Sequence, residues 1–192
     1  MFSVMETRRL ILRPWREEDG PWLAAMNADA EVMEFFPAVM TRDESLEMMA
    51  RANEKIAREG FCFAPLEERT SGRFIGFAGL HRPRFDPALA IEPCVEIGWR
   101  LIRSAWGKGY ASEAACAWLR FGFETLDLAE IVSFTSVDNK RSRAVMERLA
   151  MTHDSDDDFD HPAIADDHTL KRHVLYRLDR DSWRNQVVLS EK

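Results

Sequence analysis

A glycine-rich turn between a strand pattern and a helix pattern constrains this chain more than any other feature. Apolar residues alternate before the turn, at Val95, Ile97, Trp99 and Leu101. The turn itself reads Trp106-Gly107-Lys108-Gly109-Tyr110-Ala111, and an alanine-rich helical pattern follows to about residue 125. Free N–H groups and the dipole at a helix N-terminus attract anions, and glycines let the backbone approach a phosphate closely. The passage predicts a pyrophosphate-binding loop, and a tight turn that merely needs glycine is the structural alternative.

The turn partly matches the sequence patterns of two other phosphate-binding loops. A Walker A loop needs G-x-x-x-x-G-K-[ST], but Gly109 follows Lys108 and the earlier glycine position is Ile102, which excludes it. A dinucleotide fingerprint G-x-G-x-x-G fits better, with Ser112 in the third glycine place. That fingerprint normally opens a parallel β-α-β unit, whereas here a hairpin comes first and few strands follow. A dinucleotide oxidoreductase therefore stays open as a weaker alternative.

The composition and the net charge of the chain argue against several other classes of protein. The 192 residues are 46% apolar and 31% charged, which is typical of one folded domain, expected over 5–180 with a tail over 181–192. We see no long apolar run for a membrane helix and no secretory signal in the first nine residues, so a cytoplasmic location is expected. The net charge of −7 argues against a nucleic-acid partner. Three cysteines without zinc-ligand spacing are expected to be buried apolar residues, and no metal is expected.

The hydrophobic periodicity predicts the order β-α-α-β-β-β-α-β-α-β. We expect strands over 6–15, 61–66, 73–81, 94–102, 129–137 and 170–179. We expect helices over 19–27, 41–59, 110–125 and 139–150. Thr41 and Glu44 form a T-x-x-E capping box at the second helix, and Gly60 ends that helix.

Two motifs resemble the GNAT N-acetyltransferases, in the branch that contains the ribosomal-protein N-terminal acetyltransferases. The first is Val95 to Leu101 followed by residues 106–114, which is similar to the family's acetyl-CoA-binding motif. The second is Asn139-Lys140-Arg141-Ser142 followed by residues 144–151. The opening Thr7-Arg8-Arg9-Leu10-Ile11-Leu12-Arg13-Pro14 also matches the usual first strand of that branch.

The resemblance implies an α/β (α+β) GNAT fold. Its central sheet would be mixed and mostly antiparallel, with about six to seven strands, a splay between strands 4 and 5, and about four flanking helices. Acetyl-CoA would be the co-substrate, held by the loop amides and, at its pantetheine arm, by Asn139. The implied cofactor-binding residues are Leu101, Ile102, Arg103, Trp106, Gly107, Lys108, Gly109, Tyr110, Ala111, Asn139 and Ser142.

The resemblance implies direct attack of an amine on the thioester, which requires a base, oxyanion donors and an acid. Glu96 is the candidate base, because its apolar strand neighbours can raise a carboxylate pKa, although a solvent-facing carboxylate is the alternative. Backbone donors near Leu101 and Ile102 are the candidate oxyanion site. Many relatives use a tyrosine as the acid where this chain has Met146, so Ser142 becomes the candidate acid. Tyr110 is a second candidate for that role. The family often has Gln or Arg where this chain has Ser104.

The acceptor amine is not specified by any motif, and a protein or peptide N-terminus or a small amine all fit. His161 and Phe35 are the candidate substrate-binding residues. Trp15, Trp22 and Phe36 could join Phe35 in an acceptor lid or simply pack in a core. The aspartates between 154 and 167 either form a solvated loop or attract a cationic amine. A non-catalytic CoA-binding sensor is the alternative function, and a monomer and a homodimer both remain open.

Overall fold

The computed structural model describes the backbone of residues 4–190 and the side chains of residues 4–185. The chain forms two compact units. Unit 1 holds the described residues up to His81 together with Gly98–Trp118, and unit 2 holds Arg82–Ile97 and the described residues from Leu119 onward. The chain passes from unit 2 to unit 1 inside one strand, and returns inside one helix. No helix within the described part of the chain is long and apolar enough to cross a lipid bilayer.

The sheet of unit 1 has its strands in sequence order. These strands are β1 (Met5–Glu6), β2 (Leu10–Leu12), β3 (Ala64–Glu68), β4 (Arg73–His81) and the end of β5 (Glu96–Leu101). Antiparallel pairing joins β1 to β2, β2 to β3 and β3 to β4. The single strand predicted over 6–15 is divided, because the N–H of Thr7 donates to the carbonyl of Leu10 (2.9 Å) and closes a turn.

The close approach of β4 and β5 depends on Gly76. Its φ is +138°, and a Cβ there would lie 2.2 Å from the carbonyl oxygen of Arg100. No side chain fits at this point, since both the backbone conformation and the space require glycine. Gly76 therefore lets β5 run along β4 towards the glycine-rich turn.

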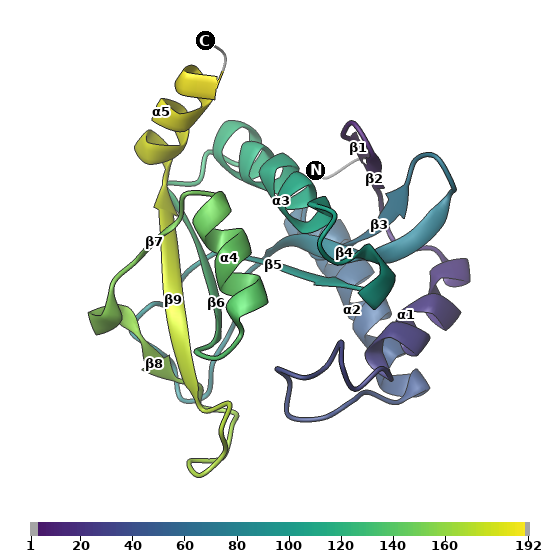
Figure 1. Ribbon diagram of the computed structural model, residues 1–192, viewed down its shortest axis with the longest axis horizontal. Helices are drawn as coiled ribbons and strands as arrows, with labels where there is room; N and C mark the ends of the chain where they lie inside the picture. Colours follow the sequence, from purple (N-terminus) through teal and green to yellow (C-terminus); the bar gives the residue numbers. More distant parts are fainter. Residues whose placement is uncertain (1–3, 191–192) are drawn as a thin grey trace. The chain divides into compact units, whose positions relative to one another are not determined.

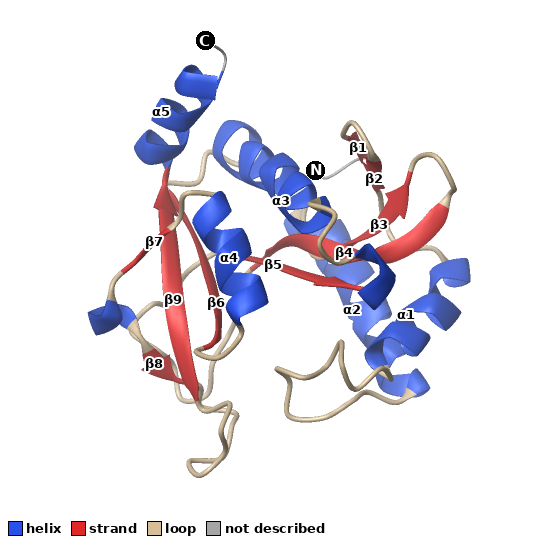
Figure 2. Ribbon diagram, viewed as in Figure 1, coloured by secondary structure: helices blue, strands red, loops and turns tan. Residues whose placement is uncertain are grey.

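Two helices pack together in unit 1, namely α1 (Gly20–Asn27) and α2 (Arg42–Glu59), after the short 3₁₀ turn η1 (Glu17–Asp19). Figure 2 shows α2 passing behind β4. The capping box is confirmed: the N–H of Glu44 donates to Thr41 Oγ1 (3.2 Å), and the N–H of Thr41 donates to Glu44 Oε2 (2.7 Å). Gly60 ends the helix at φ +85°, as expected for a left-handed C-terminal residue.

The helix predicted over 110–125 is confirmed only as far as residue 120. It is α3 (Tyr110–Arg120), and Phe121–Thr125 (η3) forms a wider π turn, in which the N–H of Leu126 donates to the carbonyl of Phe121. Cys116 lies on the outer face of α3 and is exposed, so the prediction that all cysteines are buried is wrong there; Cys62 is buried and Cys94 is partly buried.

Unit 2 is organised around β9 (Arg172–Asp179). Antiparallel pairing joins β9 to β6 (Glu130–Ser136), β7 (Thr152–His153) and β8 (Phe159–Asp160). The helix α4 (Lys140–Arg148) lies over β6 and β9 (Figure 1). The first residues of β5 pair in parallel with β6, with Glu96 opposite Val132. The splay expected beyond that pair stays a prediction.

The fold class is confirmed as mixed α/β, with mostly antiparallel strands flanked by helices. The described residues contain nine strands and five α-helices. The additional elements are the divided first strand, the two-residue strands β7 and β8, and α5 (Arg180–Ser190). The helix α5 follows β9 directly, and its Trp183 stacks on Phe123 with ring centroids 5.8 Å apart.

Candidate functional site

The glycine-rich loop of unit 1 adopts a backbone that favours glycine at two positions. After the 3₁₀ turn η2 (Arg103–Ala105), Gly107 has φ +71° and Gly109 has φ +78°. Apart from its two chain neighbours, a Cβ at Gly107 would meet no protein atom within 4 Å. The space above Gly107 is therefore open, and a phosphate can approach its backbone there.

The first turn of α3 supplies N–H groups for such an anion. The N–H of Glu113 makes the first bond of the helix, to the carbonyl of Gly109 (3.0 Å). The N–H groups of Tyr110, Ala111 and Ser112 precede that bond, so helix geometry leaves them without intrahelical partners. The positive end of the helix dipole lies at the same place. The combination fits a pyrophosphate group.

Arg9 fixes this loop to the N-terminal strands. Its Nη1 donates to the carbonyl of Lys108 (2.9 Å), and its guanidinium lies over the ring of Tyr110, 4.5 Å from the centroid. Its Nε bonds to Glu113 Oε2 (2.6 Å), while Thr7 Oγ1 donates to the other carboxylate oxygen of Glu113 (2.6 Å). The charge of Glu113 is thereby balanced beside the glycine-rich turn. The opening Thr7–Arg9 motif thus supports the loop, a role that sequence reasoning did not assign.

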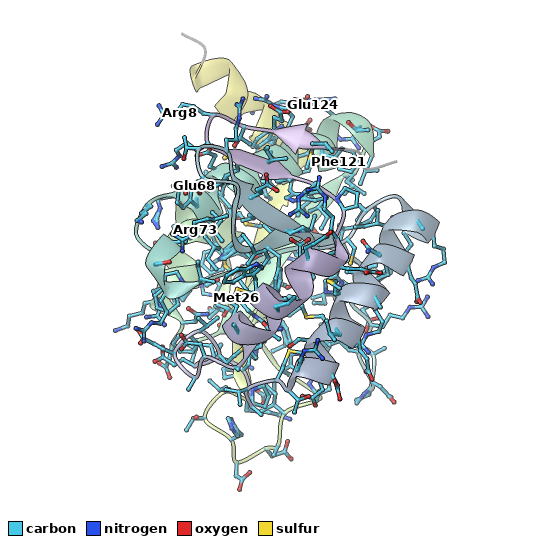
Figure 3. All side chains as sticks on the ribbon, turned by 90° about the vertical axis from the view of Figure 1, so that its right-hand side faces the viewer. Arg8, Met26, Glu68, Arg73, Phe121 and Glu124 are labelled. Carbon is cyan, nitrogen blue, oxygen red and sulfur yellow. The ribbon has the colours of Figure 1, made fainter. Side chains whose placement is uncertain are left out.

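The side chain of Tyr110 is engaged within unit 1. Its hydroxyl donates to Glu68 of β3, which raises the pKa of Tyr110. The pKa of Glu68 is lowered, first by the hydroxyl of Ser71 and then by Tyr110. Figure 3 shows Glu68 near Arg73, its register partner on β4. A raised pKa and an occupied hydroxyl make Tyr110 a poor proton donor for a leaving thiolate.

The backbone groups near the end of β5 are largely paired. The N–H of Ile102 donates to the carbonyl of Ile75 (3.1 Å), so it is not available for the oxyanion role expected of it. The indole N–H of Trp106 donates to the carbonyl of Leu101 (2.8 Å). That bond ties the Trp106 side chain back to the end of β5.

Arg103 was expected to contact the cofactor, and its guanidinium has acidic partners within unit 1. Its Nη1 pairs with Glu31, and its Nε lies 3.8 Å from Asp29 Oδ2. All three side chains are exposed, so solvent screens the pairs. An incoming phosphate would compete with these carboxylates for Arg103.

The second motif lies at the N-terminus of α4 in unit 2. Asn139 caps the helix, with its Oδ1 accepting from the N–H of Ser142 (3.1 Å) and its Nδ2 donating to Thr135 Oγ1 (2.9 Å). Ser142 lies in the first turn and is partly buried. Met146, one turn further on, is 1% exposed and belongs to the core. The helix start is therefore well ordered, and position 146 offers no proton donor.

Glu96 opens β5 and is partly buried in unit 2. The thiol of the nearby Cys94 has its pKa raised to about 11, first by burial and then by the charge of Glu96. The charge of Glu96 also acts on His161, where it opposes the lowering of the pKa by burial. The candidate base therefore shares its surroundings with a candidate substrate-binding residue.

His161 belongs to an aromatic cluster in unit 2. Its ring centroid lies 5.4 Å from that of Phe85 and 5.0 Å from that of His173. Burial lowers the pKa of His161 and lowers the pKa of His173 to about 4. Both imidazoles are consequently neutral at pH 7. The ring of Phe134 on β6 also contacts this cluster.

Phe35 and Phe36 lie in unit 1, in the segment between α1 and α2. Phe35 is partly buried, and Phe36 is 40% exposed. The ring of Phe36 covers the guanidinium of Arg100, with 4.0 Å from Arg100 Cζ to the ring centroid. Arg100 was not singled out in the sequence, although an arginine within an apolar strand pattern is itself a signal.

The aspartates of residues 154–167 are mainly partners of basic side chains. Asp157 pairs with Arg177 at 2.6 Å, and Asp158 lies 2.8 Å from His153 Nε2. Asp166 pairs with Lys171 at 2.8 Å. Among the described residues, no group of three or more His, Cys, Asp or Glu is arranged to hold a metal ion.

Comparisons with known proteins identify the family of the chain. A family model described as "Acetyltransferase (GNAT) domain" matches residues 9–152. The FsC-acetyl coenzyme A-N(2)-transacetylase of Aspergillus fumigatus is 31% identical over 155 residues, which cover 78% of this chain and 65% of that protein. The uncharacterized N-acetyltransferase YnaD of Bacillus subtilis is 29% identical over 145 residues, covering 76% of this chain and 80% of that protein.

Solved structures show the same fold. An acetyltransferase from Agrobacterium tumefaciens superposes with a TM-score of 0.74 and 27% identity, covering 93% of this chain and 95% of that one. A ribosomal-protein-S5-alanine acetyltransferase from Vibrio fischeri has a TM-score of 0.74 and 14% identity, covering 95% of this chain and 99% of that one. At that identity the second likeness concerns the fold alone.

Proposed function

The chain belongs to the GNAT family of acetyl-CoA-dependent N-acetyltransferases, and on this premise we propose that it acetylates a primary amine of a small molecule or of a protein N-terminus. Acetyl-CoA, when bound, supplies the activated acetyl group. The family match leaves the dinucleotide alternative without support. The domain boundaries, the cytoplasmic location and the choice between monomer and homodimer stay predictions.

The observation that carries this proposal is the loop of unit 1. Gly107 and Gly109 have positive φ, the space above Gly107 is open, and the first N–H groups of α3 have no intrahelical acceptors. These groups fit a pyrophosphate, and Lys108 adds a positive charge beside them. Asn139 would hold the pantetheine arm through the second N–H of its Nδ2 and the second lone pair of its Oδ1, which its bonds to Thr135 and Ser142 do not use.

Glu96 is proposed as the general base, acting directly or through one water molecule. A carboxylate at the start of a partly buried strand is a suitable acceptor for the amine proton. Ser142 is proposed to donate a proton to the leaving thiolate, since Met146 cannot. His161 and Phe35 are proposed to contact the acceptor, because His161 is a neutral ring in an aromatic cluster and Phe35 belongs to the segment between α1 and α2.

The test is a calorimetric titration with CoA, followed by a mass-spectrometric screen of amines and N-terminal peptides with acetyl-CoA. We expect CoA binding, acetyl transfer to at least one amine class, and a large loss of kcat in Glu96→Gln with CoA affinity unchanged. Absence of CoA binding at high micromolar concentration would reject the proposal.

A non-catalytic CoA sensor is the second candidate. It is favoured by the buried Met146 in place of the acid and by the use of the Asn139 side chain in capping α4. It predicts CoA binding without acetylation of any amine in the screen. Acetyl transfer that is lost in Ser142→Ala or Glu96→Gln contradicts it.

A further inference from the structure

Arg100 on β5 is a largely buried arginine whose charge is not matched by an acidic side chain. Its Nη1 donates to the amide oxygen Oδ1 of Asn27 (2.8 Å) and lies 3.9 Å from the sulfur of Met40. Its Nε is fully buried and has no hydrogen-bond acceptor. Within residues 4–185, no carboxylate pairs with this guanidinium. A buried charge without a counter-charge is unfavourable unless a ligand supplies one.

Arg13 in the same unit shows how this protein compensates a structural arginine. Its guanidinium is bonded to both oxygens of Asp19, at 2.7 and 2.8 Å, and its Nε to Glu67 at 2.9 Å. Those partners raise the pKa of Arg13, whereas burial lowers the pKa of Arg100 to about 10. The two arginines are both packed inside unit 1, and only Arg13 has carboxylate partners.

The surroundings of Arg100 hold its side chain in place with neutral groups. Asn27 is fully buried, and its Nδ2 donates to Ser45 Oγ (3.1 Å). Ser45 Oγ in turn donates to the carbonyl of Thr41 (2.9 Å), so the amide orientation of Asn27 is determined. Asn27 therefore receives Nη1 in a fixed direction and leaves the Nε edge of the guanidinium without an acceptor.

Aromatic rings cover the flat faces of this guanidinium. Phe77 of β4 lies 5.2 Å from Arg100 Cζ, and Phe36 lies 4.0 Å from it. Such contacts stabilise a cation but do not accept the N–H groups in its plane. Phe77 is buried in the core, while Phe36 is partly exposed in the segment between α1 and α2. Phe36 is therefore the solvent-exposed cover of the Arg100 guanidinium.

We propose that Arg100 binds a carboxylate of the acceptor, so that this enzyme acetylates amines that also carry a carboxylate group. The inference rests on the proposed acetyltransferase function and narrows its substrate class. The two oxygens of a carboxylate match the paired N–H groups along one edge of a guanidinium. The α-carboxylate of a free amino acid and the acidic side chain at a peptide N-terminus both supply this chemistry.

The contacts of Arg100 favour the acceptor over a phosphate of CoA. They come from α1, the segment between α1 and α2, and β4. The amides that fit a pyrophosphate lie instead in the loop before α3. If Arg100 binds the acceptor, its replacement leaves the affinity for CoA unchanged. If Arg100 binds a phosphate of CoA, its replacement lowers that affinity, so one measurement distinguishes the two roles.

The experiment compares amines that differ only in charge. Glycine, alanine and β-alanine are paired with their amides, and peptides that begin with aspartate or glutamate are paired with those that begin with asparagine or glutamine. For each pair, kcat/KM is measured with saturating acetyl-CoA. We expect the carboxylate member of at least one pair to be preferred by about tenfold or more.

Variants of Arg100 then test whether this residue causes the preference for carboxylate-bearing amines. Arg100→Gln should lose the preference while its affinity for CoA, measured by calorimetry, stays unchanged. Arg51→Gln is the matched control, because Arg51 is exposed on α2 and pairs with the exposed Glu47. Arg100→Lys keeps the charge but not the paired N–H edge, and it should retain only part of the preference. If Arg100→Gln does not fold, the wild-type comparison still decides.

Each contrary outcome has a definite meaning. Equal kcat/KM for both members of every pair overturns the inference and leaves the proposed function intact. A fall in CoA affinity in Arg100→Gln overturns it in favour of a phosphate contact. CoA binding without acetylation of any carboxylate-bearing amine also overturns it. Absence of both CoA binding and acetylation rejects the proposed function itself.

Discussion

Replacing Gly107 by alanine separates the backbone requirement of the loop from its role in binding. An alanine at φ +71° costs about 1–2 kcal/mol of folding free energy, because the left-handed conformation brings Cβ too close to the carbonyl oxygen. Apart from the two chain neighbours of Gly107, no residue has an atom within 4 Å of the added methyl group, so we expect no further loss of stability from a clash with the rest of the protein. For a chain of this size, each kcal/mol lowers Tm by about 2–4 °C.

The matched control is Gly72→Ala. Gly72 has φ +67°, and an added Cβ there likewise meets nothing within 4 Å, but the residue lies in the turn between β3 and β4. Both variants should therefore lose a similar amount of stability in urea denaturation. Only Gly107→Ala places a methyl group where the pyrophosphate is expected.

The affinity for CoA distinguishes the two variants. Displacing the phosphate from one amide removes a hydrogen bond to a charged group, worth about 1.5–3 kcal/mol. Calorimetry should show CoA binding weakened by about 10- to 100-fold in Gly107→Ala and unchanged in Gly72→Ala. Equal CoA affinities in the two variants would show that the loop does not bind the pyrophosphate.

Three further predictions concern charged groups. Arg9→Gln removes the bond to the carbonyl of Lys108, and calorimetry should show CoA binding weakened by about fivefold or more; unchanged binding contradicts the supporting role of Arg9. Asp19→Ala leaves Arg13 with one carboxylate, and urea denaturation should show a loss of about 1.5–3 kcal/mol in the free energy of unfolding; a loss below about 0.5 kcal/mol contradicts the buried pair. His173 has a folded pKa of about 4, below the unfolded value, so the unfolded state binds more protons between pH 4 and 6.5. The stability that the neutral His173 contributes to the folded state is fully present above pH 6.5. It is lost as the pH falls to 4, which lowers the free energy of unfolding by up to about 3 kcal/mol. Between pH 6.5 and 4, His173→Phe should lose correspondingly less free energy of unfolding than the wild type. Identical profiles of unfolding free energy against pH for the two proteins refute the lowered pKa of His173.

Local signals in the sequence determined most of the secondary structure. The capping box at Thr41, the C-terminal Gly60 and the hairpin of β3 and β4 depend on residues close in the chain, so they were predictable. The glycine-rich turn between β5 and α3 was predictable for the same reason. Two of the elements that were missed, β7 and β8, are only two residues long and pair with β9. Likewise, the division of the first strand depends on a turn closed by Thr7.

The roles of individual side chains were decided by tertiary contacts. The sequence identifies an arginine at position 9, but only the fold brings it to Lys108, Tyr110 and Glu113 across about a hundred residues of chain. The same holds for Arg100, whose significance is that buried neutral groups surround it and that no carboxylate of residues 4–185 pairs with it. The periodicity of a sequence shows which positions are apolar. Whether a charged side chain has a partner of opposite charge depends instead on distances between residues in the folded structure. For this reason the sequence alone identified the family and the glycine-rich loop that is proposed to bind the phosphates, and only the tertiary structure singled out Arg9 and Arg100.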